Sequence, residues 1–192
     1  MFTLVAPFVV LMIAGGIWMA LQSTRENYRL ARGAQQIFEI VATARGLEGS
    51  LSQQSDDEAL RVLFERLPFS SGLQGSRRGD SWGLPNPWGS GVMDVRVQAW
   101  RSLLTLAMPL SVPACRRLLA FLTERDVRAL GLARIETHAL DSGGTSFEGT
   151  EGRLVYEEPR SSAGPVILRD AAIIAGCGTV TPTLLALTFR LR

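Results

Sequence analysis

MFTLVAPFVVLMIAGGIWMAL, residues 1 to 21, contains no charged side chain and runs without a break into an amphipathic stretch that ends near residue 46. At about 1.5 Å of rise per residue, twenty-one helical residues span roughly 30 Å, the thickness of a bilayer's hydrocarbon core. A segment in lipid must be helical, because no water is present there to satisfy the backbone N–H and C=O groups. The sequence therefore predicts a hydrophobic transmembrane or filament-core helix over residues 1–24.

The arginines near this segment all follow it, at Arg25, Arg29 and Arg32, and no basic residue precedes Phe2. Positive residues stay on the cytoplasmic side of a membrane, so this pattern alone would place the body of the protein inside the cell. A basic leader that was cut off before Met1 would remove this constraint. We therefore interpret the chain as a mature form whose body lies outside the cytoplasm.

The composition of the 192 residues is that of one globular domain behind the apolar helix. The net charge is +2, with arginine as every basic residue, so nothing indicates a strongly electrostatic partner such as nucleic acid. Cys115 and Cys177 form no CxxC or Cys/His pattern, which argues against zinc and redox sites. In an exported chain they would form one disulfide, which closes a loop of about 62 residues and is worth roughly 4 kcal/mol. In a reducing compartment they would be two buried thiols.

An amphipathic helix follows the apolar segment. Its apolar positions recur at a spacing of three to four residues, which is typical of one buried helical stripe: Leu30, Ala34, Ile37, Val41 and Ala44. No proline separates this stripe from the apolar run, so we expect one helix of roughly 45 residues, 65 to 70 Å long. The domain plan is a helix over 1–24, its amphipathic continuation over 25–52, and an αβ head over 53–192. Gly33 is expected to be a soft point of the helix.

The head is predicted to mix helices and strands. Ser-Asp-Asp-Glu at 55–58 caps a short helix, and its acidic residues suit the positive end of the helix dipole. The remaining elements, in chain order, are a loop at 68–91, strands at 92–99 and 102–108, a helix from Ser111, weaker strands at 134–139 and 153–156, a short helix at 167–175 and a final strand at 184–192.

Catalytic and metal-binding patterns are weak. His138 is the single histidine and lies in a strand-like segment, where a structural role is the better interpretation. The loop from Asp141 to Glu151 has three acidic residues but lacks the spacing of a calcium loop. We therefore predict no enzyme activity, no cofactor and no metal site.

Trp88 lies in SWGLPNPWGSGV, residues 81–92, where Asn86 and Pro87 form a turn and Gly89 permits unusual backbone angles. We expect Trp88 to fold back onto the head just before the first strand. Two interpretations of Asn86, Trp88 and Gly89 stay open. They either fix the loop to the domain, or they contact a ligand or another subunit.

Four segments occur in order behind the apolar helix: QQIFEIVATARGL, NPWGSGVMDVRV, VPACRRLLAFL and AGCG. In this order the chain resembles the type IV pilin superfamily, most closely the type IVb pilins of thick conjugative and toxin-coregulated pili. The resemblance covers nearly the whole chain. It implies an α+β ladle fold, in which a long N-terminal helix packs on an antiparallel sheet, and a disulfide that joins Cys115 to Cys177 and bounds region 115–177.

The same resemblance implies a structural subunit that polymerises with copies of itself into an extracellular pilus for adhesion, aggregation or DNA transfer. Its partners would be the inner membrane before assembly, the prepilin peptidase, the pilus assembly machinery, and a host cell surface or DNA. Met1 would be the site of processing and N-methylation. The residues expected to pack in the filament core are Phe2, Leu4, Phe8, Leu11, Ala14, Gly15, Gly16 and Trp18.

Val5 departs from the family, which usually has a glutamate at the fifth mature position to neutralise a neighbour's terminal amine. An unpaired ammonium in a low-dielectric bundle is costly. Three explanations stay open. The chain is a minor or tip subunit, the amine reaches the Thr3 hydroxyl or backbone carbonyls, or the mature N-terminus lies upstream of Met1.

Two other functions fit the same pattern. A pseudopilin of a secretion system shares the helix and the export route but builds a short periplasmic piston. A single-pass, membrane-anchored extracytoplasmic binding domain would remain monomeric and keep its leader.

Overall fold

The computed structural model describes residues 5–67, 75–88, 91–123, 130–140, 152–158, 170–178 and 183–192, and the side chains of the first helix from Thr24 onward. These residues form an α+β fold in which helices cover an antiparallel sheet, as the sequence predicted. No helix is both long and apolar enough to cross a membrane within the part of the chain whose side chains are described. The apolar segment of residues 1–23 lies outside that set.

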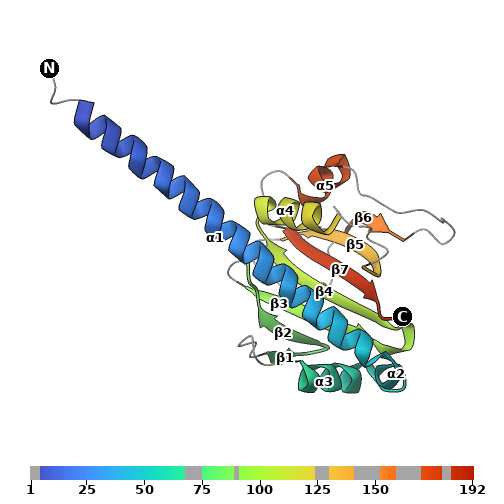
Figure 1. Cartoon of the computed structure of the whole chain (residues 1–192). Helices are drawn as coiled ribbons and strands as arrows, with labels where there is room; N and C mark the ends of the chain where they lie inside the picture. Colours follow the sequence, from blue (N-terminus) through green and yellow to red (C-terminus); the bar gives the residue numbers. More distant parts are fainter. Residues whose placement is uncertain are drawn as a thin grey trace.

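Helix α1 (Val5–Gly46) is a single helix of 42 residues. Its C-terminal half lies along the head and its N-terminal half extends beyond it (Figure 1). The predicted apolar stripe is confirmed, because Ile37 and Ala44 are completely buried and Val41 is nearly so. The helix ends at Gly46, a few residues before the end expected from the sequence, and the separate turn α2 (Glu48–Leu51) follows it.

Seven strands form one sheet with the order β1-β2-β3-β4-β7-β5-β6, and every neighbouring pair is antiparallel. The strands are β1 (Ser76–Arg78), β2 (Ser81–Pro85), β3 (Val92–Gln98), β4 (Leu103–Leu110), β5 (Leu132–Ala139), β6 (Arg153–Glu157) and β7 (Thr183–Arg190). The C-terminal strand β7 lies between β4 and β5, so the last residues of the chain complete the centre of the sheet.

Four further helical segments surround the sheet: α3 (Asp56–Arg66), the 3-10 turn η2 (Ala99–Arg101), α4 (Val112–Thr123) and α5 (Asp170–Cys177). The predicted caps are confirmed. The Ser55 hydroxyl accepts a hydrogen bond from the Glu58 N–H in α3, and the Ser111 hydroxyl accepts one from the Ala114 N–H in α4. Helix α4 packs on the core through one apolar face, with Leu118 and Leu119 completely buried.

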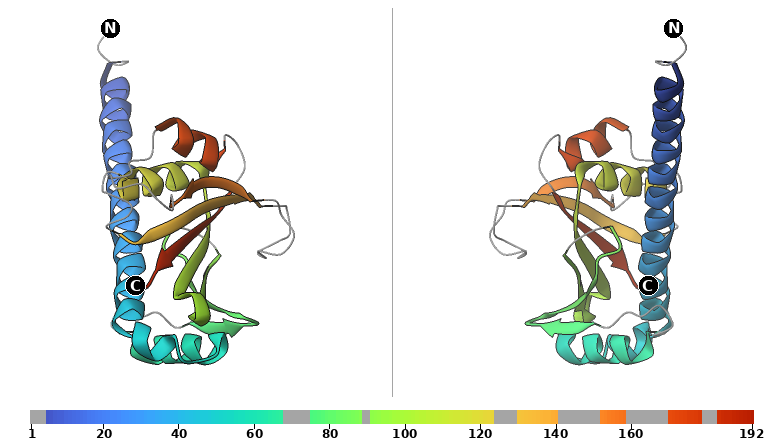
Figure 2. Two further views of the ribbon diagram at one scale, coloured as in Figure 1. Left: turned by 90° about the vertical axis from the view of Figure 1, so that its right-hand side faces the viewer. Right: turned by 90° about the vertical axis from the view of Figure 1, so that its left-hand side faces the viewer.

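Strand periodicity divides the sheet into two faces. Alternate residues such as Val95, Leu106 and Leu187 point into the core, where they pack with the apolar stripes of α1, α3 and α4. The two turned views show α1 standing along one side of the sheet (Figure 2). Some of the residues between them, such as Thr105 and Thr188, lie on the opposite face and are only partly buried, whereas Ala107 and Ala186 on that face are buried.

The prediction of a continuous loop at 68–91 is wrong for residues 76–85, which form strands β1 and β2. The hairpin turns at Gly79, whose φ of +59° is a left-handed conformation that suits glycine. Its register is set by distant residues, because Trp82 stacks on Phe64 of α3 with ring centroids 4.5 Å apart. Long-range packing, rather than local propensity, therefore makes this segment a strand.

The helix predicted at 167–175 is α5 (Asp170–Cys177), which ends two residues later than expected; residues 167–169 lie outside the described part of the chain. The residue after it, Gly178, has a φ of +68°. This left-handed conformation is typical of a glycine that ends a helix. Gly176 instead lies within the helix and packs against Val155 of β6.

Candidate functional site

The joint between α1 and the head is built from several specific side-chain contacts. At its centre the indole ring of Trp88 lies directly on the backbone of Gly33. A Cβ atom placed on Gly33 would come within 2.2 Å of the ring carbon Cζ2. Any side chain at this position would displace the indole. Gly33 was expected to be a soft point of the helix, but here its missing side chain provides the contact surface.

Asn86 holds the loop that presents Trp88. Its Nδ2 donates a 2.7 Å hydrogen bond to the Pro109 carbonyl at the end of β4, and its Oδ1 accepts one of 3.1 Å from the Trp88 N–H. Asn86 is 7% exposed, so these bonds replace water around a buried amide. The interpretation in which this loop is fixed to the domain therefore accounts for Asn86 and Trp88. Gly89 lies outside the described residues.

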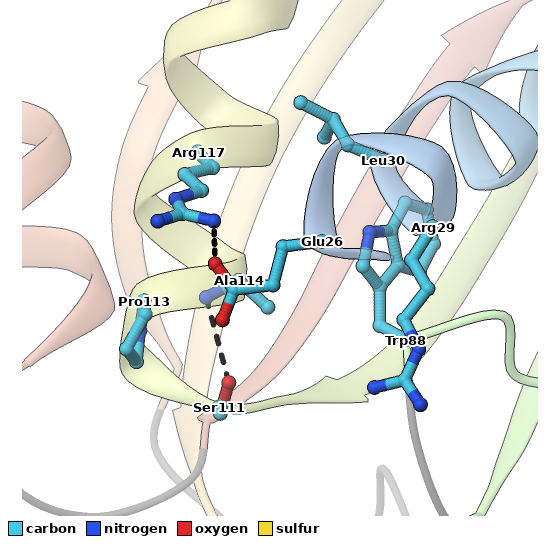
Figure 3. A pocket seen from close by; sticks show the side chains of 8 residues that line it. All are labelled: Glu26, Arg29, Leu30, Trp88, Ser111, Pro113, Ala114 and Arg117. Atoms are coloured by element: carbon cyan, nitrogen blue, oxygen red, sulfur yellow. Dashed lines mark hydrogen bonds and ion pairs between the residues drawn. The ribbon is translucent and has the colours of Figure 1, made fainter. Parts of the chain in front are cut away.

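A second bridge joins α1 to the start of α4. Glu26 extends from α1 and accepts a hydrogen bond from Arg117 on α4, with its carboxylate near the first turn of that helix (Figure 3). Both side chains are about half exposed, so this ion pair contributes little to stability in water. A pocket of about 120 Å³ lies between the two helices, and Arg29 and Trp88 also line it.

Arg45 fixes the far end of α1. Its Nη2 donates a 2.6 Å hydrogen bond to the carbonyl of Leu130, and its guanidinium also donates to the carbonyl of Arg190 at the end of β7. Gly131, with a φ of +67°, lies so close that a Cβ there would come within 1.7 Å of the guanidinium. Three separate contacts, at residues 26, 33 and 45, therefore join the C-terminal half of α1 to the head.

The disulfide that the resemblance implied is present. Cys115 on α4 and Cys177 at the end of α5 are joined across 5.7 Å between their Cα atoms, and both are completely buried. The side chain of Arg116 donates a hydrogen bond to the Gly178 carbonyl beside it. Helices α4 and α5 are thereby linked to one another over the same part of the sheet (Figure 1).

The described residues offer little for catalysis. His138 is 8% exposed on β5, and its ring packs against Gly152. No group of three or more histidine, cysteine, aspartate or glutamate side chains among the described residues is arranged to hold a metal ion. Hydrogen bonds from Arg61 lower the pKa of the Glu58 carboxyl, which lies on the exposed surface of α3.

Several predicted site residues lie outside the described part of the chain. Met1 is among them, as are the side chains of the expected filament-core residues Phe2, Leu4, Phe8, Leu11, Ala14, Gly15, Gly16 and Trp18, and the loop from Asp141 to Glu151. The roles expected for them stay predictions.

Sequence reasoning missed all three contacts of the joint, that of Arg45 with the Leu130 and Arg190 carbonyls included. A lone glycine in a helix pattern can mark either a close packing contact or a weak point of the helix. The sequence around Gly33 therefore did not by itself identify the contact with Trp88. The pairing of Glu26 with Arg117 had no signal, because 91 residues separate them.

Comparison with known proteins adds no relative: no protein-family model matches the chain, and no curated protein resembles it significantly.

Proposed function

We propose that this chain is a structural subunit of a type IVb-like pilus, which polymerises through its N-terminal helix into an extracellular filament. One observation carries the proposal. Helix α1 is fixed to the head along its C-terminal half, while its N-terminal half extends past the head and belongs to a sequence segment without charges (Figure 1). A helix of this kind has an apolar end that only lipid or other helices can cover.

The finer fold assignment is part of this proposal. We interpret the α+β fold as a ladle-shaped pilin, in which α1 is the handle and the disulfide-linked helices close region 115–177. The seven strands form a larger sheet than that of a typical pilin. Strand β1 lies at one edge of this sheet and β6 at the other.

Assembly would transfer residues 1–24 from the inner membrane into the filament core. Lipid and a helical bundle are similarly apolar, so close packing decides the outcome, and the small residues Ala14, Gly15 and Gly16 would allow helices to approach. A head-to-tail contact between identical subunits produces an open helical polymer. Prepilin peptidase and the pilus assembly machinery would be the partners, and host surfaces or DNA the targets of the filament.

Charge insertion tests this proposal. Ala14→Arg or Gly16→Arg places a guanidinium in the proposed core, and we expect either variant to abolish the filaments recovered by shearing cells. Gly46→Arg is the matched control, because a Cβ placed on Gly46 would meet no atom within 4 Å beyond its own stretch of helix, and Gly46 ends the helix on the head. All three proteins must still appear in the membrane fraction with the disulfide formed.

Normal filaments from Ala14→Arg or Gly16→Arg would overturn the proposal. Wild-type protein that stays in the envelope and never appears in sheared material would instead favour the pseudopilin. A monomer that keeps its leader would favour the anchored binding domain.

A further inference from the structure

The sheet face opposite α1 carries a groove that the pilus proposal does not use. It encloses about 350 Å³, within the range of small-ligand sites. Its floor comes from β4 and β7, and its walls come from β3 on one side and β5 on the other. The N-terminus of α3 and the turn η2 close one end.

One cross-strand row forms the centre of the groove. Arg96 on β3 is paired in register with Thr105 on β4, Thr105 with Thr188 on β7, and Thr188 with Arg134 on β5. The two threonine hydroxyls lie 3.2 Å apart. Adjacent strands are about 4.8 Å apart, so the two arginine backbones stand roughly 14 Å from one another with small side chains between them. The row therefore presents hydroxyls at the floor and a guanidinium at each wall.

The neighbouring row of the sheet is buried beside the groove, with Ala107 at 0% and Ala186 at 2% exposed. Ala107 on β4 is paired with Ala186 on β7, and Glu136 of β5 is paired with Ala186. Glu136 also forms a 2.7 Å ion pair with Arg134. In the row that lines the groove, the small threonines lie between the long side chains of Arg96 and Arg134, which makes a trough rather than a flat sheet face.

Charge identifies the class of ligand. Asp56, Asp57, Asp80 and Glu136 bring four carboxylates to a groove with three guanidiniums, so a polyanion such as DNA would meet repulsion along its length. Its polar lining equally disfavours a lipid. A sugar hydroxyl both donates and accepts hydrogen bonds, so it can pair with a guanidinium, a carboxylate or a threonine.

Trp100 adds an aromatic surface next to the groove. It is 69% exposed, and the guanidinium of Arg101, which lines the groove, lies 4.1 Å from the centre of its ring. An exposed indole offers a flat apolar surface for the C–H face of a sugar ring. We propose that this groove binds a neutral oligosaccharide, through Arg96, Arg134 and the two threonines. This binding belongs to the head and requires no filament.

The test is calorimetric titration of the full chain with maltotriose, chitotriose and lacto-N-tetraose, in a detergent that contains no sugar headgroup. We expect saturable binding of at least one of them. Arg134→Gln and the double variant Thr105→Val with Thr188→Val should each weaken it by about tenfold or more, because each removes polar contacts to the ligand. Arg32→Gln, an exposed arginine on α1, is the matched control and should bind as the wild type does.

Three results would overturn the inference. The first is no heat of binding for any of the three sugars up to about 10 mM. The second is sugar binding that the groove variants leave unchanged. The third is salt-sensitive binding of a heparin fragment or a short DNA duplex in place of the neutral sugars. Far-UV circular dichroism of each variant must match that of the wild type, so that lost binding reports the groove and not the fold.

Discussion

Replacing Gly33 by alanine tests the joint between α1 and the head most sharply, because two opposite effects compete at this position. In an exposed helix, glycine to alanine stabilises by about 1 kcal/mol. At Gly33 the added methyl would lie 2.2 Å from the indole of Trp88, so the ring must move. A buried aromatic side chain removes roughly 150–250 Å² from water. About half of that area, at about 25 cal/mol per Å², is worth about 2 to 3 kcal/mol.

Lost burial of the indole and residual strain both lower the unfolding free energy, while the better helix propensity of alanine raises it by about 1 kcal/mol. We therefore expect Gly33→Ala to lower the unfolding free energy by about 1 to 2 kcal/mol. The measurement is urea unfolding of the full chain in detergent, followed by far-UV circular dichroism. Gly46→Ala is the matched control. Gly46 lies in the same helix, and a Cβ added there would meet no atom within 4 Å beyond its own stretch of helix, so the substitution should be neutral or stabilise by up to about 1 kcal/mol.

A double-mutant cycle separates the clash from other effects. In a Trp88→Ala background the methyl at residue 33 has nothing to meet, so Gly33→Ala should then stabilise the protein as Gly46→Ala does. The sign of the substitution should thus reverse with the indole present or absent. If Gly33→Ala stabilises the wild-type protein as much as Gly46→Ala, the packing account of this joint is wrong.

Three further predictions concern the head. The double variant Cys115→Ser with Cys177→Ser should lose about 4 kcal/mol of unfolding free energy, from closure of a loop with a sequence separation of 62; an unchanged urea midpoint, with and without reductant, would count against this value. Ser55→Ala removes the α3 cap and should cost about 1 kcal/mol, whereas an equal midpoint would show that the cap is dispensable. Arg61 lowers the pKa of Glu58 in the folded protein. The stabilisation that this pairing gives is therefore present above the pKa that Glu58 has in the unfolded chain, and it is lost as the pH falls through the folded pKa. We expect a small loss of unfolding free energy at acid pH, which Glu58→Gln abolishes. A loss at alkaline pH instead would contradict the direction of the pKa shift.

Elements with strong local patterns were predictable. The apolar residues of α1 recur every three to four positions, a spacing that gives one buried face only in a helix. Those of β7 recur at every second position, which gives one buried face only in a strand. The cap at Ser55 is similarly local. Region 68–91 shows the limit, because its glycines and prolines indicate turns, while β2 exists through pairing with β3 and stacking of Trp82 on Phe64.

The candidate site was only partly predictable, for the same physical reason. Asn86 and Trp88 stood out as a motif, but the partner that gives Trp88 its role, Gly33, is 55 residues away and belongs to another element. The row from Arg96 to Arg134 depends on strand order, which places β7 between β4 and β5. Strand order is a property of the whole chain, so no local pattern reveals that row.

The most direct test of the pilus proposal is mass spectrometry of the N-terminal peptide of protein sheared from the surface of the native host. The first arginine is Arg25, so cleavage after arginine releases residues 1 to 25 as one peptide. The proposal predicts that this peptide is recovered from sheared material, begins at Met1 and carries one added methyl group. A peptide that retains a basic leader, or a chain that is absent from the sheared fraction, would contradict it.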